Sequence, residues 1–268
     1  MEHRRVYFCI RRSYDAHRVV LGVPEMTSQY LDGEYLRKNQ TWHVEDSEWK
    51  SRQIVKMLVK FMKTVTYVNG HLMIKYPIRR ICEVGCGAGD ILVHLQTSAI
   101  MSGVDFTGYD ISPQAISLCA NKENDHLRFF CHDFTKDDDR YDVILVMDVI
   151  EHLEDPYDFL RAIKPKGCLK IFHLHLDVSV QAALRVNPIM KSRRDLGHLQ
   201  LYCKETAVEL LKECDYEILD VTLPGGLLEL PSKSLKQTLA RPFIHLLRAI
   251  STDWAARVFG GSVLILAR

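Results

Sequence analysis

The chain has 268 residues, of which 47% are hydrophobic and 26% are charged. This composition is typical of a globular protein built around one main hydrophobic core. Lys and Arg number 35 against 34 Asp and Glu, so the formal net charge is only +1. Such a balance disfavours a nucleic-acid substrate, because binding a phosphate backbone needs a concentrated positive field.

The eight cysteines are scattered along the chain, and several lie in apolar runs, where cysteine packs as a small hydrophobe. No disulfide framework is predicted. Cys82 and Cys86 have no second cysteine pair at the spacing of a structural zinc site, so no metal is predicted either. The chain is therefore expected in the reducing cytoplasm.

Residues 1–25 carry five arginines but no apolar run long enough for a signal peptide or a membrane span. They are either a native extension or a stretch upstream of a start at Met26. The rest of the chain is expected to divide into two parts. Residues 26–70 form an N-terminal helical lid region, and residues 71–268 form one main domain with insertions at 175–203 and 225–258.

Apolar residues recur at nearly helical spacing from Asp46 to Met62, which predicts an amphipathic helix capped by Asp46 or Ser47. From about residue 79, short apolar runs alternate with amphipathic stretches, as in βα units on a mostly parallel sheet. Strands are expected near 79–84, 104–109, 126–131, 141–147, 168–174, 215–223 and 262–267. Helices are expected at 89–98, 112–122, 156–164 and 204–213, and within 232–258, where Pro242 should break the helical pattern.

The richest segment is a strand that runs directly into a glycine loop, Ile81-Cys-Glu-Val-Gly-Cys-Gly-Ala-Gly-Asp90. Ligands of open α/β sheets bind at the carboxyl ends of strands, and glycine lets them approach the backbone closely. The next strand ends at Asp110, whose carboxylate can accept hydrogen bonds from two ribose hydroxyls. These features predict a ligand that contains a nucleoside.

Dinucleotide-binding proteins share this design but carry G-x-G-x-x-G, whereas the third glycine here comes one residue early and Asp90 takes the sixth position. Acidic residues such as Glu83 and Asp90 disfavour a pyrophosphate. They suit the ammonium and sulfonium groups of S-adenosylmethionine, which favours that cofactor over NAD.

The glycine loop, Asp110, His132-Asp133-Phe134 and the segment from Tyr141 to Leu153 together resemble the class I S-adenosylmethionine-dependent methyltransferases that act on small molecules, including the ubiquinone-pathway type. The resemblance covers residues 79–174 most closely. It implies an α/β, Rossmann-like, doubly wound sheet of seven strands, mostly parallel with the last strand antiparallel and helices on both faces.

The resemblance also implies a set of cofactor contacts. Asp110 would bind the ribose, Ile111 would pack on the adenine, and Asp133 would accept from the adenine amine. The methionine part would be surrounded by the glycine loop and the end of the fourth strand. The predicted cofactor-binding residues are Glu83, Gly85, Cys86, Gly87, Gly89, Asp110, Ile111, Asp133, Phe134, Met147 and Asp148. Single residues also have structural explanations, since Asp133 could instead cap a helix.

Methyl transfer to an oxygen benefits from a base tuned near neutral pH, and histidine is the usual choice. His152 is the first candidate, although it could instead order the start of a helix. His198 is the second. His173 and His175 alternate on one strand and Asp177 continues their face, an arrangement that could bind a metal or present a base. His175 is also a predicted substrate contact. No third ligand set is evident in the sequence, so the predicted metal content stays at none.

Aromatic residues before the first long helix are expected to form a lid over the cofactor, with contacts from Tyr35, Trp42 and His43; the alternative is that they fasten that helix to the core. A second expectation concerns the basic amphipathic stretch 234–258. It is predicted to pack against the sheet or a second subunit, as in a homodimer, with contact to a membrane as the alternative.

The leading function is methylation of an oxygen atom on a small-molecule acceptor. The alternatives are N- or C-methylation of a metabolite, or S-adenosylmethionine binding without catalysis. A nicotinamide oxidoreductase is disfavoured by the glycine spacing.

Overall fold

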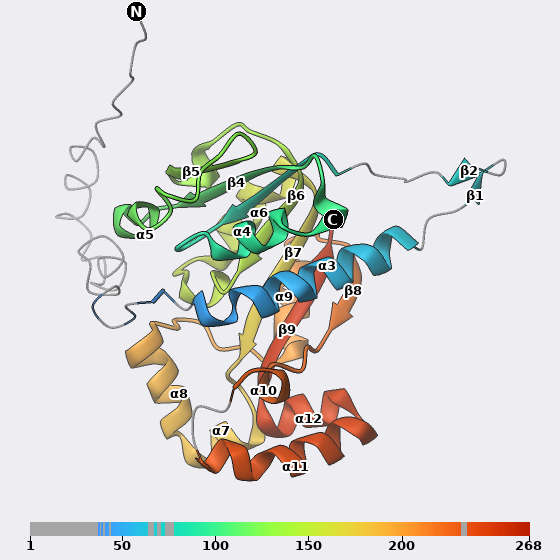
Figure 1. The fold of residues 1–268 in the computed structure, drawn as a ribbon. Coiled ribbons are helices and arrows are strands. Elements are labelled where there is room, and N and C mark those ends of the chain that lie inside the picture. The colour runs from blue at the N-terminus through green and yellow to red at the C-terminus, as the bar shows by residue number, and fades with distance from the viewer. Residues whose placement is uncertain are drawn as a thin grey trace, which may run out of the picture.

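The computed structural model describes residues 37, 39, 41–42, 44–63, 67–68, 71–72, 78–231 and 235–268. Its centre is a seven-stranded sheet in the order β5-β4-β3-β6-β7-β9-β8 (Figure 1). The strands are β3 (Arg80–Val84), β4 (Asp105–Asp110), β5 (Leu127–Cys131), β6 (Tyr141–Met147), β7 (Gly167–Leu176), β8 (Ile218–Thr222) and β9 (Gly261–Ala267). A separate pair, β1 (Tyr67–Val68) and β2 (His71–Leu72), forms a short antiparallel hairpin.

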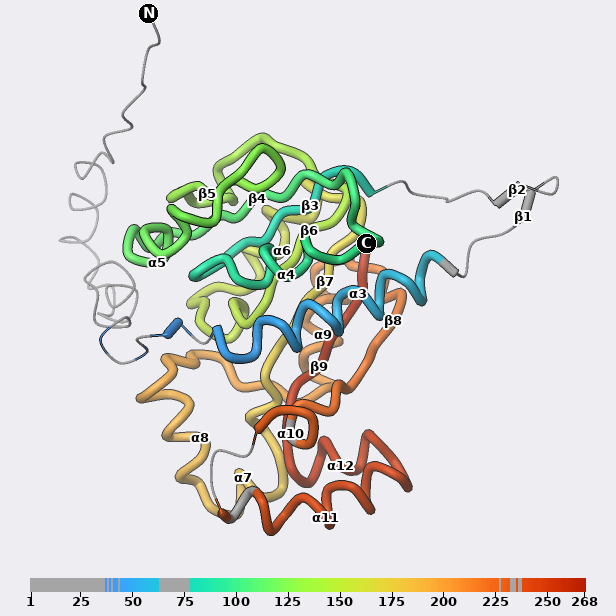
Figure 2. The backbone as a smooth tube through the Cα atoms, viewed as in Figure 1, coloured from blue at the N-terminus to red at the C-terminus, as the bar shows by residue number. Residues whose placement is uncertain are grey.

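Only β9 runs against the other strands of the large sheet. It pairs antiparallel with β7 on one side and with β8 on the other, while β3 to β7 pair in parallel. The tube in Figure 2 shows this last strand between β7 and β8. The predicted Rossmann-like doubly wound sheet, with its final strand antiparallel, is confirmed.

The helices are α3 (Ser47–Lys63), α4 (Asp90–Gln96), α5 (Pro113–Ser117), α6 (Pro156–Ile163), α7 (Val180–Arg185), α8 (Asn187–Lys191), α9 (Lys204–Glu213), α10 (Gly226–Glu229), α11 (Leu235–Ile250) and α12 (Thr252–Phe259). Single turns of 3-10 helix are η2 (Val44–Asp46), η3 (Ala99–Met101), η4 (Phe134–Lys136), η5 (Ile150–His152) and η6 (Lys164–Lys166), and η7 (Ser192–Leu196) is a π-helix. No helix of these described segments is long and apolar enough to cross a membrane.

Neighbouring residues of each strand place their side chains on opposite faces of the sheet, because side chains alternate along a strand. Ile81 of β3 belongs to the core shared with α3 and α4, whereas the next residue, Cys82, belongs to the core shared with α6 and α9. Ile54 and Leu58 bring α3 onto the first face and are fully buried. Burying each such side chain contributes about 1.5–3 kcal/mol, which holds this helix on the sheet.

Local signals explain where the helices begin. The Ser112 hydroxyl accepts the Ala115 amide and the Asp155 carboxylate accepts the Asp158 amide, each with a proline in the first turn, so both predicted starts are confirmed. Helix α5 is shorter than the expected 112–122, since turns replace the helix after Ser117.

The expected break at Pro242 is wrong. Helix α11 continues through this residue from Leu235 to Ile250. Proline removes one backbone donor and crowds the preceding turn, but a helix can continue past it when the rest of its face packs. Ile244 is buried on that face. On the other face, exposed apolar side chains recur at helical spacing: Leu239, Phe243, Leu246 and Ile250.

Candidate active site

The glycine loop leaves β3 in backbone conformations that only glycine adopts easily. Gly85, Gly87 and Gly89 have φ angles of 74°, 54° and 82°. The Gly85 and Cys86 amides donate to the Tyr109 carbonyl at 2.7 and 3.0 Å, which ties the loop to the end of β4. A Cβ on Gly87 would lie 2.4 Å from the Trp42 indole. The tryptophan ring therefore covers the open side of this glycine.

Asp110 joins the glycine loop to the start of α5. One carboxylate oxygen accepts the Gly87 amide at 2.9 Å, and the other accepts the Ser112 amide at 2.8 Å. Burial raises the pKa of Asp110, and these amides partly offset the effect. The carboxylate lies at the carboxyl end of β4, where the predicted ribose would bind.

Glu83 is a buried carboxyl with an unused acceptor. Its side chain is 1% exposed, and no hydrogen-bond partner of its Oε2 lies among the described residues. Burial raises the pKa of Glu83 well above its ordinary value, and the charge of Lys50 opposes this only in part. A buried acceptor without a partner is costly, so the site suits a ligand that brings a cationic donor, such as the ammonium of an amino acid.

The other predicted cofactor residues occupy the same edge of the sheet. Ile111 is 45% exposed directly after β4, and Met147 is buried at the end of β6. Asp133 caps η4, accepting the Thr135 amide at 3.0 Å. Phe134 is 1% exposed and packs between Tyr109 and Tyr141 in the core. Geometry thus gives these last two residues structural roles, and their contacts with adenine stay predictions.

Trp42 is the only member of the predicted lid trio within the described residues, since Tyr35 and His43 lie outside them. Helix α3 follows it closely and is firmly held. The Trp49 indole donates to Glu229 of α10 at 2.7 Å, and Ile54 and Leu58 enter the core. Trp42 therefore lies over Gly87, five residues before a helix that is held firmly against the core.

Four histidines gather where β6 and β7 end, and we name His152, His173, His175 and His198 the histidine cluster. The rings of His152 and His198 have centroids 4.9 Å apart, and those of His175 and His198 are 5.5 Å apart. The two predicted catalytic residues and the predicted substrate contact His175 thus lie together, although the first and last are 46 positions apart in the sequence.

Asp148 anchors one side of the cluster. It accepts from His173 Nδ1 at 2.5 Å and pairs with Lys50 at 2.5 Å. Burial opposes its charge, but His173 and Lys50 outweigh that effect and hold the pKa of Asp148 well below its ordinary range. Lys50 itself is 7% exposed and also pairs with Asp46 at 2.9 Å. The sequence analysis did not single out Lys50 as a site residue. The only sequence feature that could have identified it is its position next to Trp49, on the apolar side of α3.

Hydrogen bonds fix the orientation of the remaining histidines. His198 Nδ1 lies 2.6 Å from an Asp177 oxygen, and His175 Nδ1 lies 3.1 Å from Glu151. His152 Nδ1 lies 3.2 Å from the Gly197 carbonyl. A carbonyl only accepts, so the Nδ1 of His152 carries the proton and its basic lone pair is on Nε2. Burial lowers the pKa of His152, which favours this neutral form.

Comparison with known proteins agrees with this geometry. Residues 50–221 match the family model described as a methyltransferase domain. A ubiquinone biosynthesis O-methyltransferase of Coxiella burnetii is 25% identical over 173 residues, covering 59% of this chain and 68% of the relative. One from Cereibacter sphaeroides is 31% identical over 100 residues, covering 34% and 39%.

Many solved structures share the fold, among them two methyltransferases bound to their cofactor product. The plantazolicin methyltransferase bound to S-adenosylhomocysteine (SAH) and a monoazolic desmethylPZN analog has a TM-score of 0.59 at 19% identity, covering 90% of this chain and 92% of that one. The magnesium protoporphyrin IX methyltransferase of Synechocystis, also with SAH, has a TM-score of 0.52 at 13% identity, covering 82% and 83%. The glycine loop, Asp110 and the unpartnered Glu83 oxygen fit this cofactor. The chain therefore belongs to the methyltransferase domain family and is a class I S-adenosylmethionine-dependent methyltransferase.

Proposed function

We propose that this enzyme methylates an oxygen atom of a small-molecule acceptor, with His152 as the general base. The observation that carries the proposal is the histidine cluster at the carboxyl ends of β6 and β7, where His152 has Nδ1 directed at a carbonyl and its lone pair on Nε2. The curated relatives, which are O-methyltransferases of ubiquinone biosynthesis, support oxygen as the acceptor atom.

The cofactor would be held along the edge formed by β3, β4 and β6. In this proposal Glu83 accepts from the amino-acid ammonium, residues 85–89 line the methionine part, and Asp110 binds the ribose. Ile111, Asp133 and Phe134 would surround the adenine, with Met147 and Asp148 beside the methionine. When bound, S-adenosylmethionine supplies a methyl group already activated by its sulfonium.

The work left to the protein is positioning, exclusion of water and removal of one proton. His152 would take the proton of the acceptor hydroxyl, while His175 and His198 contact the acceptor. Trp42 would exclude water above the glycine loop, with Tyr35 and His43 as further predicted lid residues. A cytoplasmic location is part of the proposal, and the seven cysteines within the described ranges are free thiols.

The test is methyl transfer from S-adenosylmethionine to a panel of phenols, alcohols and amines, comparing His152→Gln with His245→Gln, a control on the exposed surface of α11. We expect transfer to a hydroxyl, with kcat about 100- to 10,000-fold lower in His152→Gln and cofactor affinity unchanged. The control should match the wild type. Transfer to nitrogen or carbon that survives His152→Gln would refute the base assignment. Cofactor binding without transfer to any acceptor would favour a non-catalytic protein.

A further inference from the structure

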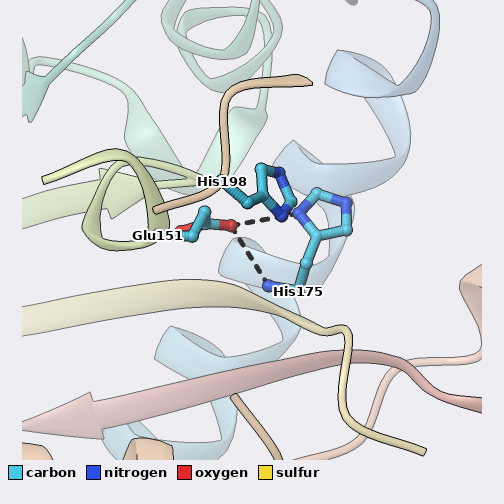
Figure 3. A group of neighbouring side chains, drawn as sticks. All are labelled: Glu151, His175 and His198. Atoms are coloured by element: carbon cyan, nitrogen blue, oxygen red, sulfur yellow. Dashed lines mark hydrogen bonds and ion pairs between the residues drawn. The ribbon is translucent and has the colours of Figure 1, made fainter. Parts of the chain in front are cut away.

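Three potential metal ligands from distant parts of the chain converge in the histidine cluster. Glu151 comes from η5, His175 from the end of β7, and His198 from the loop after η7 (Figure 3). One ligand atom from each lies within 4.8 Å of the other two. We propose that these three residues bind a divalent first-row transition metal ion, for which Zn²⁺ is the reference probe.

The donor set fits this class of ion. Two imidazoles and one carboxylate form the ligand set of one class of catalytic zinc sites and of one class of non-haem iron sites, and both keep further positions open. Magnesium and calcium, in contrast, prefer oxygen ligands only. His175 Nδ1 and Glu151 Oε1 are 3.1 Å apart. Ligand atoms about 2.1 Å from a tetrahedral metal lie roughly 3.4 Å from one another, so small side-chain movements would close the site.

Outer contacts hold two of the ligands in place. Asp177 accepts from His198 Nδ1 at 2.6 Å and from the Ser192 hydroxyl at 2.7 Å, which leaves His198 to ligate through Nε2. A carboxylate on the far nitrogen of a histidine ligand is a recurrent feature of metal sites. The amides of residues 199 and 200 donate to the Glu151 carbonyl at 2.7 and 3.0 Å, fastening the loop to η5.

Glu151 supplies an independent indication. Its side chain has no exposed surface, and its Oε2 has no hydrogen-bond partner among the described residues. A fully buried carboxylate oxygen without a partner is expensive to maintain. A cation held between Glu151, His175 and His198 would give this oxygen a partner.

The role of the ion rests on the proposed function, whereas the site itself does not. An open coordination position would take the acceptor hydroxyl and favour loss of its proton, as a bound metal does for water. The proton would pass to His152. The oxygen lone pair would then form the new O–CH₃ bond as the CH₃–S bond breaks with its electrons left on sulfur, giving the methyl ether, SAH and one released proton.

The test measures metal binding without methyl transfer. The full chain, stripped by a chelator and dialysed, is titrated with Zn²⁺ by calorimetry and with Co²⁺ by visible absorption. We expect one equivalent of either ion, with Co²⁺ bands of a nitrogen and oxygen site and no thiolate charge-transfer band. His175→Gln and His198→Gln should each weaken binding more than about 100-fold. Asp177→Asn, an outer contact, should weaken it about 10- to 100-fold, and His245→Gln not at all.

Wild-type protein that binds no equivalent of Zn²⁺, or binds it equally well in both histidine variants, would overturn the proposal. Circular dichroism and cofactor affinity of each variant establish that it is folded, and His175, with a 40% exposed side chain, is the variant least expected to disturb the core. Stoichiometric metal binding with no methyl transfer would refute the proposed function alone. Methyl transfer by a protein that binds no metal would refute the metal site alone.

Discussion

Substituting Gly87 by alanine tests whether Trp42 lies over the glycine loop in solution. The residue has a φ of 54°, and a non-glycine residue in the left-handed region costs roughly 1–2 kcal/mol. The added Cβ would also lie 2.4 Å from Cδ1 and 2.6 Å from Nε1 of the Trp42 ring. Overpacking of this kind costs typically about 1–3 kcal/mol. We therefore expect Gly87→Ala to lose about 2–5 kcal/mol of unfolding free energy.

Gly103 provides a matched control, because its φ is 77° and a Cβ there meets no atom within 4 Å. Gly103→Ala should cost only the backbone part, roughly 1–2 kcal/mol. Urea unfolding of the wild type, Gly87→Ala, Trp42→Ala and the double variant then isolates the contact. We expect a coupling of about 1–3 kcal/mol, with Trp42→Ala relieving the Gly87→Ala penalty. Equal costs at positions 87 and 103, together with a coupling below about 0.5 kcal/mol, would refute the placement of Trp42.

Three further predictions concern single charged residues. Asp110→Asn replaces a carboxylate that accepts the Gly87 amide, so the affinity for S-adenosylmethionine, measured by calorimetry, should fall about 10- to 100-fold. Unchanged affinity would count against the assignment of Asp110 to the ribose. Lys50→Met leaves Asp148 without its ammonium partner and should cost about 3 kcal/mol in urea unfolding, whereas a cost under about 1 kcal/mol would contradict a structural ion pair. Burial, aided by Lys164, lowers the pKa of Lys170 from 10.5 to about 8, so the native state binds fewer protons than the unfolded chain between these values. The unfolding free energy of the wild type should therefore rise by at most about 3 kcal/mol as the pH increases across that window, whereas that of Lys170→Met should not. Parallel pH profiles of the two proteins would disprove the lowered pKa of Lys170.

Strand positions in the sheet could be predicted because each strand is a short apolar run bounded by polar or turn residues. Segments 141–147 and 204–213 were predicted with the bounds that the structure has. Helix ends were harder, since α5 stops at Ser117 where a periodic pattern continues. The predicted break at Pro242 was wrong because it considered only the backbone donor that proline lacks. Packing of the surrounding helix α11 outweighs the loss of that one hydrogen bond.

The candidate site also has a part that could be predicted from the sequence and a part that could not. The glycine loop and Asp110 are signalled by residue type and spacing, so they could be predicted from the sequence alone. The partners of the histidines could not, because they depend on which distant loops meet. Glu151 and His175 come from different elements, and His198 reaches them only through a π-helical turn and the loop behind it. Two of the three proposed metal ligands, Glu151 and His198, lie outside the pattern of His173, His175 and Asp177, and only the tertiary arrangement brings them to His175.

The position of β9 has a consequence for how the chain folds during synthesis. Residues 261–267 follow every other described strand in the chain, yet they lie between β7 and β8. Until they emerge from the ribosome, β8 has no partner strand among the described residues, and the edge of β7 that β9 will cover, Lys170–Leu176, is unpaired. Such edges recruit other chains. The half of the sheet that carries His173 and His175 is therefore completed last, and a nascent chain depends on its helices, or on a chaperone, to shield that edge until β9 arrives.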